Sequence, residues 1–175
     1  GKSRLRAGQQ GRALVDLIER IRADHGGPRP AGVDHRLRQR DFSDDADAPL
    51  FPYLGLPIRE LETLDAALLI GSNIRKDQPL LGLRLRKAFL RDAALFAVNP
   101  VDYDFNFDFK AKAIIDPAAM PAALARIARV LAESTGASLS SEVATLAAGK
   151  PSDAERAIAA GLKDANSPGS LVGNF

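Results

Sequence analysis

The sequence predicts an α/β protein, a three-layer Rossmann-like parallel sheet with helices on both faces. Two short runs, AALLI (66–70) and ALFAV (94–98), are apolar on both faces, as in parallel strands that are covered on both sides. The stretch between these runs is amphipathic, and Pro79 stands where a helix would begin. Further helical stretches follow, and strands that alternate with helices are typical of a parallel sheet.

The sequence predicts one helix and a long connection in the amino-terminal part of the chain. Residues 11–24, GRALVDLIERIRAD, carry apolar side chains at helical spacing and end before Gly26-Gly27-Pro28. Residues 29–55 are rich in Pro, Asp and Arg, which predicts a long irregular connection. Connections of this length are usually functional or held by a partner. A short helix, PIRELETL, with Pro57 in its first turn, then leads into a sheet core expected at about 65–175.

The carboxyl-terminal elements follow in order. We expect a loop at NPVDYDFNFDF (99–109), a strand at AKAII (111–115), a helix at about 118–134, a helical piece SSEVATLAAG that stops at Gly149, a helix DAERAIAAGLKDA and a strand at SLVGN (170–174). Ser152 and Glu155 have the spacing of a capping box, which fixes the start of the last helix. The alternating aromatic residues of the loop form one apolar face, which we expect to pack on this domain or on a partner.

The composition excludes several classes of protein. The chain has 175 residues, 46% of them hydrophobic and 26% charged, which is typical of about one globular domain. It contains no cysteine, so it can form no disulfide, thiolate nucleophile or Cys-ligated cluster. Its two histidines, His25 and His35, are interpreted as surface residues rather than metal ligands. No apolar run reaches the roughly 18 residues that a membrane span requires.

The charge pattern argues against nucleic-acid binding. The formal net charge is only +2, and no long block of Lys and Arg is present. One predicted helix is basic, with Arg84, Arg86, Lys87 and Arg91. This helix could clamp an acidic partner or phosphates, but a solvated face or an interface with a neighbouring domain is the better interpretation.

The strongest candidate for a ligand site is the turn after the first apolar strand. Gly71 permits a tight exit from the strand, and Ser72 and Asn73 can bond to nearby backbone or to a phosphate. In open α/β sheets ligands bind at the carboxyl ends of the strands, where Asn99 also falls. Neither the GxGxxG nor the P-loop pattern is present. A structural turn is therefore favoured over a ligand site. Carboxylates of the aromatic segment, read as an acid–base pair or a calcium site, are weaker candidates.

Two stretches resemble known families. ALLIGSNIRKDQPLLGLRLRKA resembles the strand–turn–helix of the molybdopterin oxidoreductase superfamily, whose pattern is an apolar strand, G-[ST]-N-x-R-x-x-x-P and a helix with R-x-R-K. DHRLRQRDF, from Asp34 to Phe42, resembles the segment before that strand in the G subunits of bacterial proton-translocating NADH-quinone oxidoreductases. The resemblance is clearest from about Asp34 to Ile115.

The superfamily resemblance implies a site that has lost its chemistry. In the active molybdenum enzymes the turn matching Gly71, Ser72, Asn73 and Arg75 lies near the pterin nucleotide. The turn after the second strand there has a D-P-R-type sequence, whereas this chain has Asn99 followed by Pro and Val. An expected Asp and Arg are thus replaced, and within this stretch no Cys or selenocysteine can ligate a metal, although Ser could. We therefore expect these five residues to form a vestigial cofactor site, with no cofactor in this chain.

The subunit resemblance implies a role within a larger assembly. It predicts that residues 1–175 are a fragment of one molybdopterin-oxidoreductase-like domain, with iron–sulfur clusters elsewhere in the full-length subunit. The domain would support electron transfer from NADH to quinone as a scaffold, without catalysis of its own. Its partners would be other subunits of the peripheral arm, on the cytoplasmic side of the bacterial inner membrane. The alternatives are an active pterin- or nucleotide-binding oxidoreductase domain and a non-enzymatic binding module.

Overall fold

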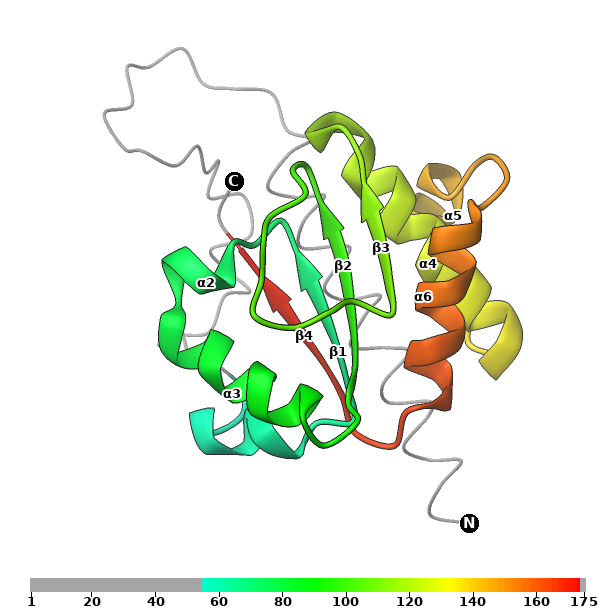
Figure 1. Cartoon of the computed structure of the whole chain (residues 1–175). Helices are drawn as coiled ribbons and strands as arrows, with labels where there is room; N and C mark the ends of the chain where they lie inside the picture. The colour runs from blue at the N-terminus through cyan, green and yellow to red at the C-terminus, as the bar shows by residue number, and fades with distance from the viewer. Residues whose placement is uncertain (1–54, 174–175) are drawn as a thin grey trace, which may run out of the picture.

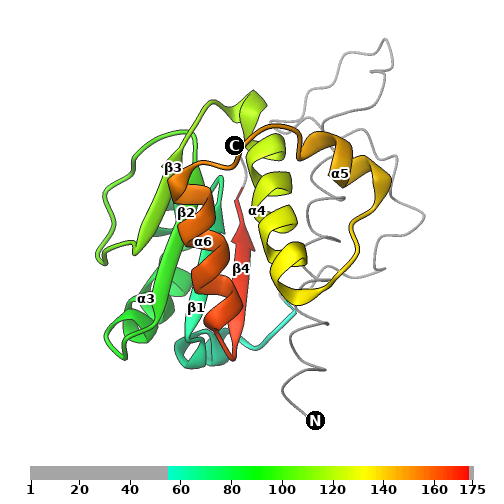
Figure 2. The same ribbon diagram turned by 90° about the vertical axis from the view of Figure 1, so that its right-hand side faces the viewer.

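The structure, a computed structural model, describes residues 55–173 (Figure 1). The predicted helix 11–24 and residues 29–54 of the predicted connection lie outside the described residues. Within them, four parallel strands form one sheet in the order β3-β2-β1-β4. Helices lie on both faces of this sheet (Figure 2), which confirms the predicted α/β class and its three layers.

The apolar runs form the strands that were expected of them. The strands are β1 (Ala66–Ile70), β2 (Ala94–Asn99), β3 (Ala111–Ile114) and β4 (Pro168–Val172). The helices are the 3-10 helices η1 (Ile58–Thr63) and η2 (Pro117–Ala119) and the α-helices α2 (Ile74–Asp77), α3 (Pro79–Phe89), α4 (Met120–Thr135), α5 (Ser141–Leu146) and α6 (Asp153–Asp164).

Alternate residues of the central strands enter two separate cores. Ala66, Leu68 and Ile70 of β1 face α4, α5 and α6. The intervening Ala67 and Leu69 face η1 and α3. Every residue of β1 is buried, so the strand has no polar face, as a sheet covered on both sides requires.

The connections between strands reverse direction after β3. From β1 the chain passes through α2 and α3 to β2, and from β2 through residues 100–110 to β3, in both cases on the α3 side of the sheet. It then crosses by α4, α5 and α6 on the opposite face to reach β4, beside β1. Direction and face change together, so the crossovers keep one hand. The strand order therefore reverses between β1 and β4, where open α/β sheets bind ligands.

Several boundaries differ from the sequence predictions for local reasons. The predicted helix at Pro57 is a 3-10 helix that starts at Ile58. The predicted helix 118–134 is divided into η2, where the Asp116 carboxylate accepts a hydrogen bond from the Ala118 amide, and α4. The helical piece expected to reach Gly149 ends at Leu146, where the Arg129 guanidinium donates to the carbonyl oxygens of Ala147 and Gly149.

The last strand starts earlier than expected, at Pro168 instead of Ser170. Pro168 pairs with Ala66, so β4 runs along the full length of β1. The Asp65 carboxylate accepts hydrogen bonds from the amides of Asn166 (2.7 Å) and Ser167 (2.9 Å), which sets this register just before the strand. Among residues 55–173, no helix combines the length and the apolar character needed to cross a membrane.

Candidate functional site

The candidate site lies at the carboxyl ends of β1 and β2, in the turn Gly71–Asn73 and at Asn99. Gly71 has a φ of +55°, the left-handed conformation that glycine adopts most easily. Its amide donates to the Val98 carbonyl oxygen of β2 (2.9 Å). The expected tight exit from the strand is therefore present. The helix that follows, α2, has only four residues and offers little of the anion-binding dipole that a long helix provides.

The side chain of Asn99 joins the two strand ends. Its Oδ1 accepts a hydrogen bond from the Ser72 amide (2.9 Å), and its Nδ2 donates to the Ser72 carbonyl oxygen (3.3 Å). Asn99 is 1% exposed and Ser72 is 5% exposed. A buried side-chain amide that uses both of its polar ends in this way satisfies the backbone of the turn. We call this pair of hydrogen bonds the Asn99–Ser72 clamp.

Backbone also occupies the position just beyond the carboxyl ends of β1 and β4. The Gly173 amide donates to the Ile70 carbonyl oxygen (2.8 Å). A Cβ atom on Gly173 would lie 2.2 Å from the carbonyl oxygen of Gly71 and 2.6 Å from the Cα of Ser72. At the point where the strand order reverses, the backbone of Gly173 therefore lies against the turn at Gly71 and Ser72.

Arg75 makes no contact with the Asn99–Ser72 clamp. It reaches residues 100–110 between β2 and β3, which we call the crossover loop. Its Nη1 donates to the Asp104 carboxylate (2.9 Å) and to the Asp104 carbonyl oxygen (3.2 Å). The arginine side chain is 43% exposed and that of Asp104 is 91% exposed, so the pair lies at the surface. The structure thus brings Gly71, Ser72 and Asn99 together and directs Arg75 to a carboxylate of the same chain.

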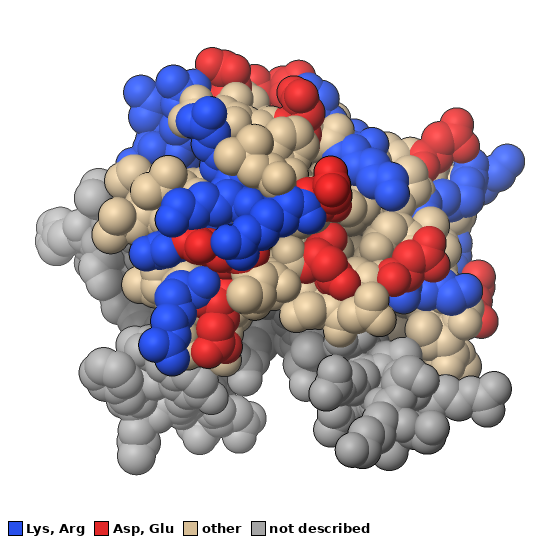
Figure 3. All heavy atoms as spheres, turned by 60° about the horizontal axis from the view of Figure 1, so that its bottom comes forward, with Lys and Arg blue, Asp and Glu red and all other residues tan. Residues whose placement is uncertain are grey.

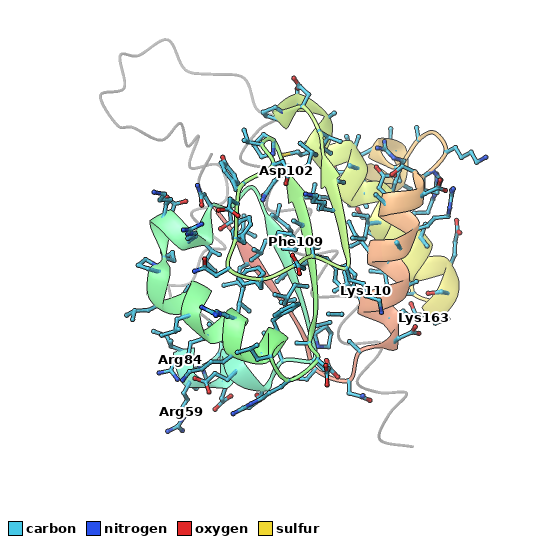
Figure 4. All side chains as sticks on the ribbon, viewed as in Figure 1. Arg59, Arg84, Asp102, Phe109, Lys110 and Lys163 are labelled. Carbon is cyan, nitrogen blue, oxygen red and sulfur yellow. The ribbon has the colours of Figure 1, made fainter. Side chains whose placement is uncertain are left out.

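The aromatic segment packs on this domain, as one of the two expected possibilities. In Figure 4 the labelled Phe109 and Asp102 lie on the loop that crosses the front of β2. The rings of Phe105 and Phe107 stack with centroids 5.4 Å apart, and Phe109 meets both edge-on. Phe107 is buried in the core under α3. The loop thus replaces a crossover helix by a row of aromatic side chains.

Basic side chains of α3 surround one carboxylate of η1. The Glu62 carboxylate accepts from Arg84 and from Lys87 (3.0 Å), and Arg91 lies 3.9 Å away. The hydrogen bonds from Lys87 and Arg84 lower the pKa of Glu62. Figure 4 shows Arg84 beside η1, and Figure 3 shows Lys and Arg side chains gathered around acidic ones on this side. Part of the basic face therefore meets this chain itself.

Another ion pair, which the sequence did not reveal, joins α4 to α6. Arg126 donates to both oxygens of the Glu155 carboxylate, at 3.0 and 2.6 Å, and the same carboxylate accepts from the Ser152 amide (2.9 Å). The predicted capping box is therefore confirmed and also anchors the neighbouring helix. Burial tends to raise the pKa of Glu155, but the hydrogen bonds from Arg126 and Ser152 outweigh it and hold that pKa below its ordinary value.

The residues at the strand ends are a poor match for a pterin nucleotide. The amides of Gly71 and Ser72, which would face a phosphate, already donate to Val98 and Asn99. Both polar ends of the Asn99 side chain are also used, and the Arg75 guanidinium contacts Asp104. In the described part of the chain, no three His, Cys, Asp or Glu side chains form a group that could hold a metal ion.

One buried polar group at the site has no partner within residues 55–173. The Ser72 side chain is buried, and among the described residues no hydrogen bond reaches its hydroxyl group. The sequence identified Ser72 by its place in the turn. It gave no sign of Asp104 as the partner of Arg75 or of Glu62 as the partner of α3, because those contacts depend on the tertiary fold.

Comparison with known families agrees with this architecture. The family model described as molybdopterin oxidoreductase matches residues 10–148, which is most of the chain. Neither a curated protein nor a solved structure matches this chain. The chain belongs to the molybdopterin oxidoreductase family.

Proposed function

We propose that this chain is a scaffold domain of the G subunit of a bacterial proton-translocating NADH-quinone oxidoreductase. In this proposal the domain supports electron transfer from NADH to quinone and carries out no redox step itself. Iron–sulfur clusters lie elsewhere in the full-length subunit, and other peripheral-arm subunits are its partners. The assembly lies on the cytoplasmic side of the inner membrane.

The observation that carries the scaffold role is the Asn99–Ser72 clamp. The chain belongs to an oxidoreductase family. Its parallel sheet brings the carboxyl ends of the strands to one edge, where open α/β sheets bind ligands. However, the polar groups of Asn99 and the amide of Ser72 bond to each other, so they stabilise the turn rather than face a ligand. A fold can be kept after its site has changed purpose.

The subunit assignment depends on the sequence resemblance. The DHRLRQRDF stretch from Asp34 to Phe42 is the segment that favours the G subunits over other members of the superfamily. The test is the complete reading frame together with the assembly that it enters. We expect cysteine clusters upstream of residue 1, and we expect an affinity-tagged full-length protein to co-purify with NADH-quinone oxidoreductase activity. Co-purification with an unrelated assembly would contradict the proposal.

One observation favours an active nucleotide-binding domain as a second candidate. The buried Ser72 hydroxyl, beside a glycine with positive φ, could donate to a phosphate. Calorimetric titration of the purified chain with GDP separates the two candidates. The scaffold role predicts no heat of binding up to millimolar GDP, whereas saturable binding that is lost in a Ser72→Ala variant would support the active domain.

A further inference from the structure

The outer face of α3 carries exposed leucines beside basic side chains. Leu80 and Leu83 of α3 are 69% and 50% exposed, and Leu90, the C-cap residue just after the helix, is 70% exposed. At about 100° per residue, these three leucines lie within one stripe, opposite the buried Leu81 and Leu85. We call this stripe, with the neighbouring Arg86, the outer face of α3. Exposed leucines grouped on one helix indicate a surface that another segment covers.

The charge of this face is of one sign. α3 contains no acidic residue, and Glu62 of η1 is paired with Arg84 and Lys87. Arg86 is exposed and has no ion pair within residues 55–173. A segment that covers the face should therefore combine carboxylates with apolar side chains. A second copy of α3 would set like charges against each other.

The chain itself contains such a segment. We propose that residues 41–51, DFSDDADAPLF, dock on the outer face of α3. The segment has four aspartates and no Lys or Arg, and Phe42, Leu50 and Phe51 can cover the leucines. Its carboxylates meet Arg86, while its apolar side chains take Leu80, Leu83 and Leu90 out of water. This inference does not depend on the proposed function.

The connection is long enough for this contact. The described part of the chain begins at Gly55 and continues directly into η1, which packs along α3. The 11 residues of α3 extend about 16 Å, and an extended chain reaches about 3.3 Å per residue. Residues 41–51 can therefore span the whole outer face without disturbing η1.

Disulfide trapping tests the contact directly, because the chain has no cysteine of its own. Ala46→Cys is paired with Leu83→Cys on α3 or, as a control, with Ala160→Cys on the exposed side of α6, across the sheet. The shorter loop alone favours the first pair by roughly fivefold. Each oxidation rate is therefore divided by its rate in urea. We expect the normalised rate of the α3 pair to exceed that of the α6 pair about tenfold, and equal rates would overturn the proposal.

Further substitutions separate docking from chance encounters. Leu80→Ser should slow trapping of the α3 pair, whereas Ile114→Ser, which alters an exposed residue of β3, should leave it unchanged. Arg86→Glu should slow trapping about threefold, and Asp45→Lys in the same chain should restore it. Failure of this charge exchange would count against the docked segment.

Two other occupants of the face give distinct outcomes that would overturn the proposal. If a second copy covers it, mixed single-cysteine chains form disulfide dimers faster than the double-cysteine chain closes on itself. If an anionic membrane covers it, the full chain floats with vesicles rich in phosphatidylserine, and Leu80→Ser abolishes flotation.

Discussion

The side chain of Asn99 holds the backbone of Ser72 by two hydrogen bonds of opposite sense, one accepted and one donated. The two residues are 27 positions apart and lie at the ends of adjacent parallel strands. Their contact lies at the edge of the sheet where open α/β folds bind ligands. A carboxylate cannot replace the amide here, because it has no hydrogen to donate.

Replacing Asn99 by Asp should therefore destabilise the protein, although the two side chains have the same shape. The Asp carboxylate would still accept from the Ser72 amide but would face the Ser72 carbonyl oxygen, in a place that is 1% exposed. We expect a loss of about 2–4 kcal/mol in the free energy of unfolding, measured in urea at pH 7. The control is Asn106→Asp in the exposed part of the crossover loop, where less than about 0.5 kcal/mol is expected. Equal stability of both variants would show that the clamp contributes nothing.

Two helical glycines should respond in opposite ways to a methyl group. A Cβ on Gly161 of α6 would lie 2.1 Å from the ring of the buried Phe96, so Gly161→Ala forces one of them to move and should cost about 1–3 kcal/mol. A Cβ on Gly82 of α3 would lie 3.4 Å from the Ile74 carbonyl oxygen, an ordinary contact. Gly82→Ala should then stabilise the protein by up to about 1 kcal/mol. Thermal unfolding of the two variants in parallel checks the contrast, which fails if both shift the same way.

The sheet could be predicted because its signals are local. β1 coincides with the apolar run AALLI, and the capping box at Ser152 fixed the start of α6 at Asp153. The position of the turn at Gly71 also followed, because a glycine directly after an apolar run favours a tight turn with positive φ.

The partners of the candidate site could not be predicted because they depend on tertiary register. Nothing near Ser72 in the sequence indicates that Asn99 will be its partner, and nothing near Arg75 indicates Asp104. The sequence was equally unable to predict which face of α3 is exposed. Leucines lie all around this helix, so its periodicity could not say that Leu81 is buried while Leu80 is exposed.

The crossover loop should be held by its aromatic core rather than by its surface ion pair. Phe107 is 8% exposed and contacts the rings of Phe105, Phe109 and Phe89, so Phe107→Ala should cost about 3 kcal/mol. Asp104→Asn removes the pair with Arg75, but both side chains are well exposed, and a change below about 1 kcal/mol is expected. Urea unfolding measures both variants. A larger effect of Asp104→Asn would mean that the ion pair, and not the rings, fixes the loop.

Glu155 should make the stability of the protein depend on acid. Its pKa is lowered in the folded protein, so the unfolded chain binds a proton at this group first as the pH falls below the ordinary value of 4.5. The stabilisation is therefore present above pH 4.5 and is lost as the pH falls through the lower, folded pKa.

Glu155→Gln should cost about 2–3 kcal/mol at pH 7, because Arg126 loses its charged partner. Urea unfolding at several pH values should show the gap between wild type and variant closing below pH 4.5. Glu133→Gln, whose side chain is 69% exposed and 3.7 Å from Arg129, is the matched control and should change stability by less than about 0.5 kcal/mol. A gap that stays constant down to pH 2 would refute the linkage.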